Sequence, residues 1–363
     1  MINVKNLTVE EFEKRIKAKK VICFCAGQGL LETCEKYPIL ESQIVCIVDN
    51  FKHGQTMKIH NYTISIISID ELKDISKDVI LLITSIQYAK QIIIQLDELK
   101  YMDGFPVYIP NIFTDEIIDV EISNINKIVI PKKIHYCWFG KSEIPIPFQK
   151  NIETWKKYCP DYEIIQWNES NYDVSKSKYI KQAYEVKKWG FVPDYARLDI
   201  INTYGGIYLD TDVELVKPLD NLLAYELFCG FESRRFVAFG LGFGGKANHP
   251  ILQEMMNVYD ETEFIKEDGT LNLTPSPIYQ TNILLKYGLI QNGQCQKHDN
   301  YVVFSKEYFA PINAYGFGNV TKNTYSIHQY AATWFNEEQK REKEKIEENY
   351  KFVMERIEKG NYK

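Results

Sequence analysis

Two aspartates, Asp210 and Asp212, follow the apolar run Ile207–Leu209. Side chains two residues apart on an extended chain share a face, so both carboxylates can reach one point. If the run is a strand of an α/β sheet, that point lies at the carboxyl edge, where such sheets bind ligands. Neighbouring carboxylates repel each other unless a divalent cation neutralises them, and oxygen ligands suit Mn²⁺ or Mg²⁺. The spacing therefore predicts a metal site that can bridge a diphosphate.

The same short motif has two other interpretations. Asp-x-Asp triplets are common as solvated acids at strand ends. The run before Asp210 also resembles the motif of haloacid-type phosphoryl-transferring hydrolases, in which the first aspartate is a nucleophile. That motif requires Thr or Val at the position of Glu214, so a phosphatase is the weaker hypothesis.

The segment before the acidic pair predicts the elements that position it. Residues 194–204 have the pattern of a helix, and Gly205 and Gly206 can terminate it in a left-handed conformation before the strand begins. Asp194 and Arg197 are three residues apart and share a face of this helix. They form either an ordinary surface ion pair or part of the same site.

Four blocks of sequence occur in order between Ile130 and Trp334: IPKKIHYCWFG (130–140), TWKKYCPDYEIIQWNE (154–169), DYARLDIINTYGGIYLDTDV (194–213) and TYSIHQYAATW (324–334). Together they resemble the family 32 glycosyltransferases, whose sugar-binding region carries a DxD motif. This family is similar to the catalytic domain of the large clostridial glucosylating toxins. The resemblance implies a GT-A type α/β domain and a retaining, metal-dependent transfer from a nucleotide sugar.

The resemblance also implies roles for individual residues. Trp138, at the end of a predicted strand, would stack on the base of the donor, although a core tryptophan is the alternative. Asp194 would hold ribose or sugar hydroxyls, and Arg197 would contact the transferred sugar or the phosphates. Tyr208 would line the donor site. Asp210 would bind donor hydroxyls and help Asp212 to hold the metal.

The last block would complete the site. The resemblance makes His328 a further metal ligand, while the indole N–H of Trp334 would donate to the leaving phosphate. Thr333 stands where the family usually has Ser, so the hydroxyl is kept. Residues 275–277 stand where the family usually has Gly-Pro, so the resemblance does not define the acceptor site. The expected catalytic residues are thus Asp210, Asp212, Arg197 and Trp334. Gly and Asn residues at 316–323 predict hinges that let residues 317–334 close over the donor.

Length and patterning predict two domains and a terminal helix. We expect a small Rossmann-like βαβ domain at 1–125, since strand-like and helix-like stretches alternate there, and the GT-A domain at 126–336. Residues 337–363 form a charged amphipathic helix whose apolar stripe is Ile346, Tyr350, Val353 and Ile357. The stripe is expected to dock on the protein itself; contact with a membrane surface or a second copy is the alternative.

A two-glycine turn in the first domain leaves a second ligand site open. Gly27 and Gly29 follow the first long strand, and Asp49 ends the next one, as in dinucleotide-binding units. Glu32 replaces the third glycine of that motif. Because any strand-to-helix connection benefits from glycine, a structural role is the stronger interpretation.

Composition limits which partners and which cellular compartment we expect. The net charge of -6, without a Lys/Arg cluster, argues against a nucleic-acid partner. The eight cysteines include no C-x-x-C pair, and no apolar stretch approaches a membrane span. We expect a cytoplasmic protein with reduced cysteines, peripheral at most to the inner face of the membrane.

The expected function is that of a hexosyltransferase. The first candidate moves galactose from UDP-galactose, or another hexose from a UDP-sugar, to a growing oligosaccharide or polysaccharide. The acceptor is a saccharide, with a lipid-linked one included, as in capsular polysaccharide synthesis. The alternatives are a sugar-nucleotide-binding regulatory protein without turnover and a toxin-like enzyme that glycosylates proteins.

Overall fold

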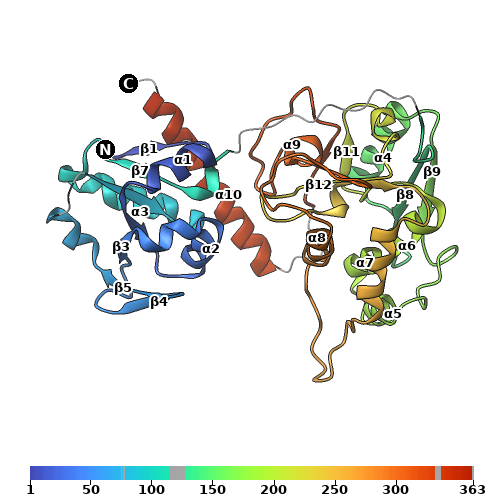
Figure 1. Ribbon diagram of the computed structural model, residues 1–363, viewed down its shortest axis with the longest axis horizontal. Helices are drawn as coiled ribbons and strands as arrows, with labels where there is room; N and C mark the ends of the chain where they lie inside the picture. The colour runs from blue at the N-terminus through green and yellow to red at the C-terminus, as the bar shows by residue number, and fades with distance from the viewer. Residues whose placement is uncertain (75, 77, 115–126, 332–336, 362–363) are drawn as a thin grey trace. The chain divides into compact units, whose positions relative to one another are not determined.

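A computed structural model describes residues 1–363 except 75, 77, 115–126, 332–336 and 362–363. The chain divides into two compact units, the first made of Met1–Glu116 with Asn336–Lys363 and the second of Ile117–Phe335. Figure 1 shows each unit as a sheet with helices packed against it. The α/β class predicted from the sequence is confirmed in both units. The predicted boundary between residues 125 and 126 lies outside the described residues.

The first unit is built on a sheet whose strands all run in parallel except the edge strand β4, which is antiparallel to β5. Its spatial order is β1 (Asn3–Lys5), β7 (Pro106–Tyr108), β6 (Val79–Ile83), β2 (Lys20–Phe24), β3 (Ile44–Val48), β5 (Tyr62–Ile67) and β4 (Thr56–Ile59). The helices of this unit are α1 (Val9–Ile16), α2 (Gln28–Lys36), α3 (Ala89–Glu98) and α10 (Glu337–Asn361). Buried central strands such as β6 explain the continuous apolar run in the sequence.

The two-glycine turn of this unit has a packing explanation. A Cβ added to Gly29 would lie 2.6 Å from the carbonyl oxygen of Thr84, so glycine lets α2 approach the end of β6. The carboxylate of Asp49 accepts hydrogen bonds from the backbone N–H groups of Ala26, Phe51 and Lys52, at 2.9, 3.0 and 3.1 Å. Gly29 thus serves helix packing and Asp49 connects two loops, which supports the structural interpretation.

Helix α10 packs on the first unit through the apolar stripe expected from the sequence. Tyr350, Val353 and Ile357 are buried, and the helix contacts β1 and α3. The guanidinium of Arg356 donates to both carboxylate oxygens of Asp97, at 2.7 and 2.6 Å. A membrane or dimer contact through this stripe would have to displace these interactions. Within the described residues, no helix is both long and apolar enough to cross a bilayer.

The second unit is built on a mixed sheet. Its spatial order is β14 (Gln296–Lys297), β15 (Val302–Phe304), β12 (Leu227–Gly230), β13 (Phe243–Gly245), β10 (Gly206–Tyr208), β8 (Lys133–Cys137) and β9 (Glu163–Trp167). Strand β13 is antiparallel to both β10 and β12, whereas β8 is parallel to β9 and β10, and β12 is parallel to β15. Strands β9, β8, β10, β12 and β15 therefore point the same way and end at one edge.

Helices cover both faces of this sheet. The helices are α4 (Ile146–Tyr158), α5 (Lys178–Glu185), α6 (Val192–Tyr204), α7 (Pro250–Asp260), α8 (Ser276–Lys286) and α9 (Lys306–Phe309). In β10, Tyr208 packs into the core formed with α5, α6, α7 and α8, while Ile207 packs into the core formed with α4 and α9. The strand is buried on both faces, so its end is held rigidly. A small second sheet pairs β11 (Val213–Leu215) with β16 (Ser326–His328).

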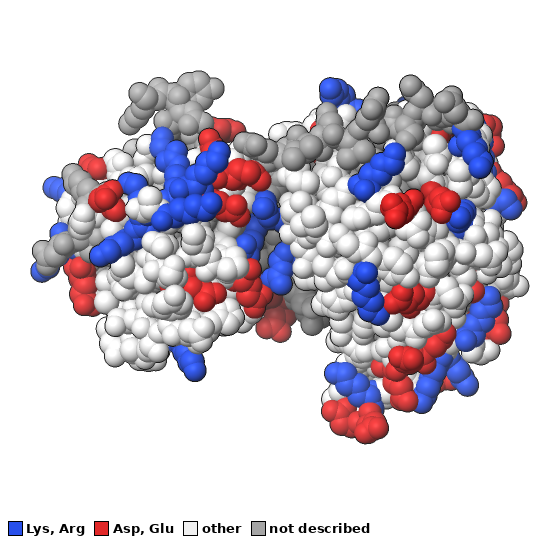
Figure 2. Space-filling model, in the orientation of Figure 1, with Lys and Arg blue, Asp and Glu red and all other residues white. Residues whose placement is uncertain are grey.

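The surface of the two units differs in charge. Figure 2 shows Lys and Arg side chains gathered in a band on the first unit, whereas the visible face of the second unit carries scattered charges of both signs on a mostly uncharged surface. The visible face of the second unit thus has no extended basic track.

A buried histidine anchors the connection between α6 and β10. The Nδ1 atom of His135 accepts from the indole N–H of Trp167 at 3.1 Å, and Nε2 lies 2.9 Å from the carbonyl oxygen of Gly205. The indole can only donate, so Nδ1 carries no proton and Nε2–H is the donor to Gly205. Burial lowers the pKa of His135 to about 4. Gly206, at φ +118°, is required here because a Cβ would lie 2.8 Å from the imidazole.

We expect acid to destabilise the second unit through His135. The unfolded chain binds the proton at the ordinary imidazole pKa of 6.5, but the folded unit binds it only near pH 4. Between these values the unfolded state carries more protons, so the free energy of unfolding falls as the pH falls, by about 2 kcal/mol between pH 7 and 5. Urea unfolding followed by tryptophan fluorescence measures this unit alone, because all five tryptophans lie within it.

The control is His135→Gln, which removes the titrating group. The variant should be less stable at pH 7, but its free energy of unfolding should change less with pH than that of the wild type. Parallel pH profiles for the two proteins would contradict the assignment of the effect to His135.

Candidate active site

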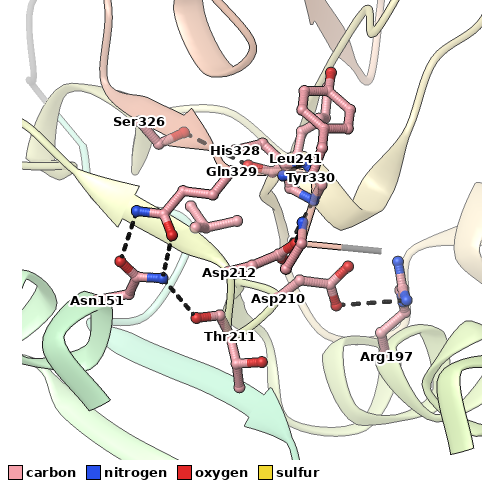
Figure 3. Close-up of polar contacts among 12 residues, drawn as sticks. Asn151, Arg197, Asp210, Thr211, Asp212, Leu241, Ser326, His328, Gln329 and Tyr330 are labelled. Atoms are coloured by element: carbon pink, nitrogen blue, oxygen red, sulfur yellow. Dashed lines mark hydrogen bonds and ion pairs between the residues drawn. The ribbon is translucent and has the colours of Figure 1, made fainter. Parts of the chain in front are cut away.

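Asp210 and Asp212 lie in a tight turn that joins β10 to β11 (Figure 3). The N–H of Val213 donates to the carbonyl oxygen of Asp210 at 3.0 Å, which closes this turn. The expectation that an extended chain would place both carboxylates on one strand face is therefore wrong in detail. The turn directs Asp210 toward α6 and Asp212 toward β16, yet it keeps both at the carboxyl edge of β10.

Asp194 and Arg197 form an ion pair beside Asp210 rather than on an exposed helix surface. The Nη2 atom of Arg197 lies 3.2 Å from Asp194 Oδ1 and 3.5 Å from Asp210 Oδ1. The side chains of Arg197 and Asp194 are only 5% and 8% exposed, whereas that of Asp210 is 26% exposed. The guanidinium also donates through Nε to the carbonyl oxygen of Pro193 and lies over the ring of Tyr208. Arg197 is thus fixed with one side toward the site.

Asp212 meets His328 because β11 pairs with β16. In the register of that pair Val213 lies opposite His328, and the imidazole Nε2 is 3.3 Å from Asp212 Oδ1. The other carboxylate oxygen accepts from the N–H of Ala331 at 3.0 Å. Asp212 and His328, more than a hundred positions apart in the chain, therefore meet at one point.

A bridge of amides holds the turn in place. Asn151 on α4 donates to the carbonyl oxygen of Thr211 at 2.9 Å and accepts from the amide of Gln329 at 3.1 Å. The N–H of Gln329 donates to the carbonyl oxygen of Asp212 at 2.9 Å. Figure 3 shows this bridge beside the acidic turn. The turn is therefore fixed to α4 and to the segment after β16.

The charges of these groups are unbalanced without a cation. Burial raises the pKa of Asp210, and the charge of Asp212 adds to this effect against the opposing Arg197. Burial by itself would raise the pKa of Asp212 and lower that of His328, but their mutual attraction lowers the first and raises the second. Crowded carboxylates of this kind are relieved by a positive ion.

The donor set fits a divalent cation. Ligand atoms of Asp210, Asp212 and His328 all lie within 4.8 Å of one another, and among the described residues these are the only such group of three. Ligands about 2.0 to 2.2 Å from an ion are separated by at most roughly 4.4 Å, so a small contraction would complete the site. Two carboxylates and one imidazole suit Mn²⁺ or Mg²⁺.

The structure describes two of the remaining residues that were predicted to bind the donor, Trp138 and Tyr208. Trp138 follows β8 at the same sheet edge, partly buried, with its indole N–H donating to Ser142 and its ring packed edge-on to Phe148. Tyr208 is 1% exposed and lies beneath the site, where it supports Arg197 and donates to the carboxylate of Asp210. Thr333 and Trp334 lie outside the described residues.

Part of the segment 317–334 that precedes Trp334 is a strand and not a loop. Residues 326–328 form β16 and pair along their whole length with β11. The hinge expected over residues 317–334 is therefore limited on one side by a strand that is already in place.

Two residues near the acidic turn, Gly240 and Glu232, carry no recognisable signal in the sequence, and Ser276 is marked only by the unusual segment 275–277. Ser276, at the start of α8, hydrogen-bonds to Asp194, whose pKa burial nevertheless raises to about 6. Gly240 lies against Asp210 and Arg197. Glu232 follows β12, and its charge, after those of Asp212 and Asp210, helps to raise the pKa of His328. Only the strand order brings these residues to the acidic turn, and strand order is not readable from spacing.

Comparison with known proteins identifies part of this unit. A family model described as "Glycosyltransferase sugar-binding region containing DXD motif" matches residues 145–229. That segment contains α4, α6 and the acidic turn, and it ends within β12. The match includes Asp194, Arg197, Asp210 and Asp212 but neither Trp138 nor His328.

Two curated relatives are fungal. The chain is 29% identical over 157 residues to inositol phosphoceramide mannosyltransferase 3 of Schizosaccharomyces pombe, covering 39% of this chain and 40% of the relative. It is 26% identical over 203 residues to mannosyl phosphorylinositol ceramide synthase SUR1 of Saccharomyces cerevisiae, covering 54% and 51%. The chain thus matches about half the length of these relatives. Among solved structures, the PaToxG glycosyltransferase gives a TM-score of 0.36 at 19% identity, over 43% of this chain and 69% of that one.

We expect Gly240→Ala to damage the metal site while leaving the fold intact. An added Cβ would lie 2.5 Å from Asp210 Oδ2 and 3.1 Å from Arg197 Nη1, so these two side chains would have to move. Overpacking of this kind destabilises a packed site by about 1 to 3 kcal/mol. Because about 1.4 kcal/mol corresponds to a tenfold change in affinity, the affinity for Mn²⁺ measured by calorimetry should fall about tenfold or more. Gly27→Ala, where the added Cβ meets nothing within 4 Å, is the control. Wild-type affinity in Gly240→Ala would show that Asp210 does not need its observed position.

Proposed function

Because the chain carries the DXD sugar-binding region of the glycosyltransferases, we propose that it transfers a hexose from a nucleotide sugar to a saccharide acceptor with the aid of Mn²⁺ or Mg²⁺. The main support is the convergence of Asp210, Asp212 and His328 to within 4.8 Å beside the buried guanidinium of Arg197. A cation and a guanidinium side by side suit a diphosphate, which carries charge on both phosphates.

The main task of the protein in this reaction is to stabilise the charge that develops as the diphosphate leaves. Asp212, His328 and Asp210 would hold a divalent cation, which would stabilise the charge on the phosphate oxygens as a Lewis acid. Arg197 adds a fixed positive charge that needs no reorganisation, since its contacts to Asp194 and Pro193 already orient it. Asp194 and Asp210 offer acceptor oxygens for hydroxyls of the donor. Trp334, which lies outside the described residues, remains the proposed donor to the leaving phosphate.

We further propose that the transferred sugar retains its anomeric configuration. The support is the family resemblance alone, and attack would come from the face that the diphosphate leaves. The anomer of the product, determined by NMR, tests this proposal directly.

We propose the donor and the acceptor only as chemical classes. UDP-galactose or another UDP-hexose is our first candidate. Since two of the relatives are named as mannosyl-transferring enzymes, GDP-mannose belongs in the same panel. We propose an oligosaccharide or polysaccharide acceptor, lipid-linked forms included, and a capsular role at the cytoplasmic side of the membrane. Release of nucleoside diphosphate in the panel separates an enzyme from a sugar-nucleotide-binding regulator.

A toxin-like activity on proteins remains the second enzymatic candidate. It would be favoured if protein substrates, but not saccharides, accelerated diphosphate release.

We expect Asp212→Ala to abolish metal-dependent UDP binding and turnover. The substitution removes a ligand at the end of a turn, not a core group, so the second unit should remain folded. Calorimetry with UDP and Mn²⁺ measures the loss, and circular dichroism checks the fold. Asp220→Ala is the control, because that side chain pairs with Lys132 on the surface of the same unit. Unchanged turnover in Asp212→Ala would eliminate the proposed metal site.

We expect Trp138→Ala to weaken donor binding by about 1 to 3 kcal/mol, the scale of one base–aromatic stack. Trp138→Phe keeps an aromatic face and should lose less. Titration of each variant with UDP in the presence of Mn²⁺ provides the affinities. Equal affinity for wild type and Trp138→Ala would mean that the indole only packs against Phe148.

A further inference from the structure

A third acidic residue lies at the edge of the sheet that carries the metal site. Glu232 follows β12, after the intervening residue Phe231. Since β10 and β12 are both antiparallel to β13, they run in the same direction. Glu232 therefore leaves the sheet at the edge where Asp210 does, although 22 positions separate them in sequence.

Glu232 is close enough to the proposed metal ligand His328 for its charge to act on it. Its side chain is partly buried. It does not belong to the group of ligand atoms that lie within 4.8 Å of one another. Within the described part of the chain, its carboxylate makes no hydrogen bond and no ion pair. A partly buried carboxylate without a protein partner can accept a hydrogen bond from a ligand.

The local fold does not require this carboxylate. The hairpin that contains Glu232 is closed by its own backbone: the N–H groups of Glu232 and Ser233 donate to the carbonyl oxygen of Phe236, at 2.9 and 3.3 Å. A bridge between Phe231 and Val237 continues the pairing. The side chain is therefore free to serve a ligand.

We propose that Glu232 binds the saccharide acceptor by accepting a hydrogen bond from the hydroxyl that attacks the donor. This inference rests on the proposed function and extends it to the acceptor. Attack from the leaving-group face would place the acceptor hydroxyl next to the phosphate, and a phosphate bound to the metal would lie beside Asp212 and His328. A carboxylate beside His328 is thus in the right place, and its oxygens match the hydroxyl donors of a sugar.

The transfer step balances without an additional reagent. The bond from the anomeric carbon to the phosphate oxygen breaks, and its electron pair stays on the diphosphate. The acceptor oxygen forms the new bond to that carbon, and its proton passes to the leaving phosphate oxygen. Glu232 orients the hydroxyl and keeps no proton.

The test compares two reactions of the same protein. Diphosphate release from the active donor of the panel is measured with Mn²⁺ in water alone, and then with methyl α- and β-hexopyranosides of glucose, galactose and mannose. A hexoside should accelerate release by the wild type. Glu232→Gln should lose about 10- to 100-fold in kcat/KM for the hexoside, mainly through KM, and much less in the rate in water and in the Mn²⁺ affinity.

Two further variants sharpen the comparison. Glu232→Asp keeps the charge but withdraws it by one methylene, so it should be intermediate. Glu226→Gln is the matched control, because Glu226 precedes the same strand at its other end and pairs with Lys246 on the surface. Its kinetics should equal those of the wild type.

Each other outcome overturns the inference. A loss of Mn²⁺ affinity by Glu232→Gln as large as its loss in kcat/KM would make Glu232 part of the metal site, and an equally large loss of the rate in water would make it part of the donor site. Equal acceleration of variant and wild type would exclude any role in acceptor binding, as would a wild type that hydrolyses the donor but responds to no hexoside. A wild type that releases diphosphate from no donor would instead refute the proposed function itself.

Discussion

The burial of Arg197 among carboxylates is the constraint on which the second unit depends. A guanidinium that is 5% exposed is stable only if its charge is met, and Asp194 and Asp210 meet it from α6 and from the end of β10. With Asp212 close by, the three carboxylates carry more negative charge than one guanidinium neutralises. The site therefore carries a surplus of negative charge, which is the electrostatic condition for binding a cation.

The mixed sheet determines which side chains join this cluster. Because β13 reverses direction between β10 and β12, the strands on either side of it end at the same edge. Trp138 after β8, Asp210 after β10 and Glu232 after β12 thus leave the sheet at the same edge, from three separate parts of the chain. The β11–β16 pair adds His328 from a fourth part. Each contributor rests on a buried strand or on a strand pair, so the geometry does not depend on a mobile loop.

The first unit is stabilised by different means. Its two-glycine turn and Asp49 are used by the fold itself, in helix packing and in backbone hydrogen bonds. Helix α10 returns to this unit from the other end of the chain and buries Tyr350, Val353 and Ile357 there. The unit thus includes both ends of the described chain, whereas the residues of the site all come from the second unit.

The sequence by itself determined the parts of the site whose spacing is local. The i, i+3 relation of Asp194 and Arg197, the glycine-terminated helix and the acidic pair after an apolar run were all readable, because helix and strand periodicity depend on near neighbours. Tertiary structure decided the rest. That the acidic pair lies in a turn, that Tyr208 supports Arg197 from below, and that Gly240, Ser276 and Glu232 lie at the site follow from strand order and helix docking. Those features arise from contacts between residues far apart in the chain, and no local pattern encodes them.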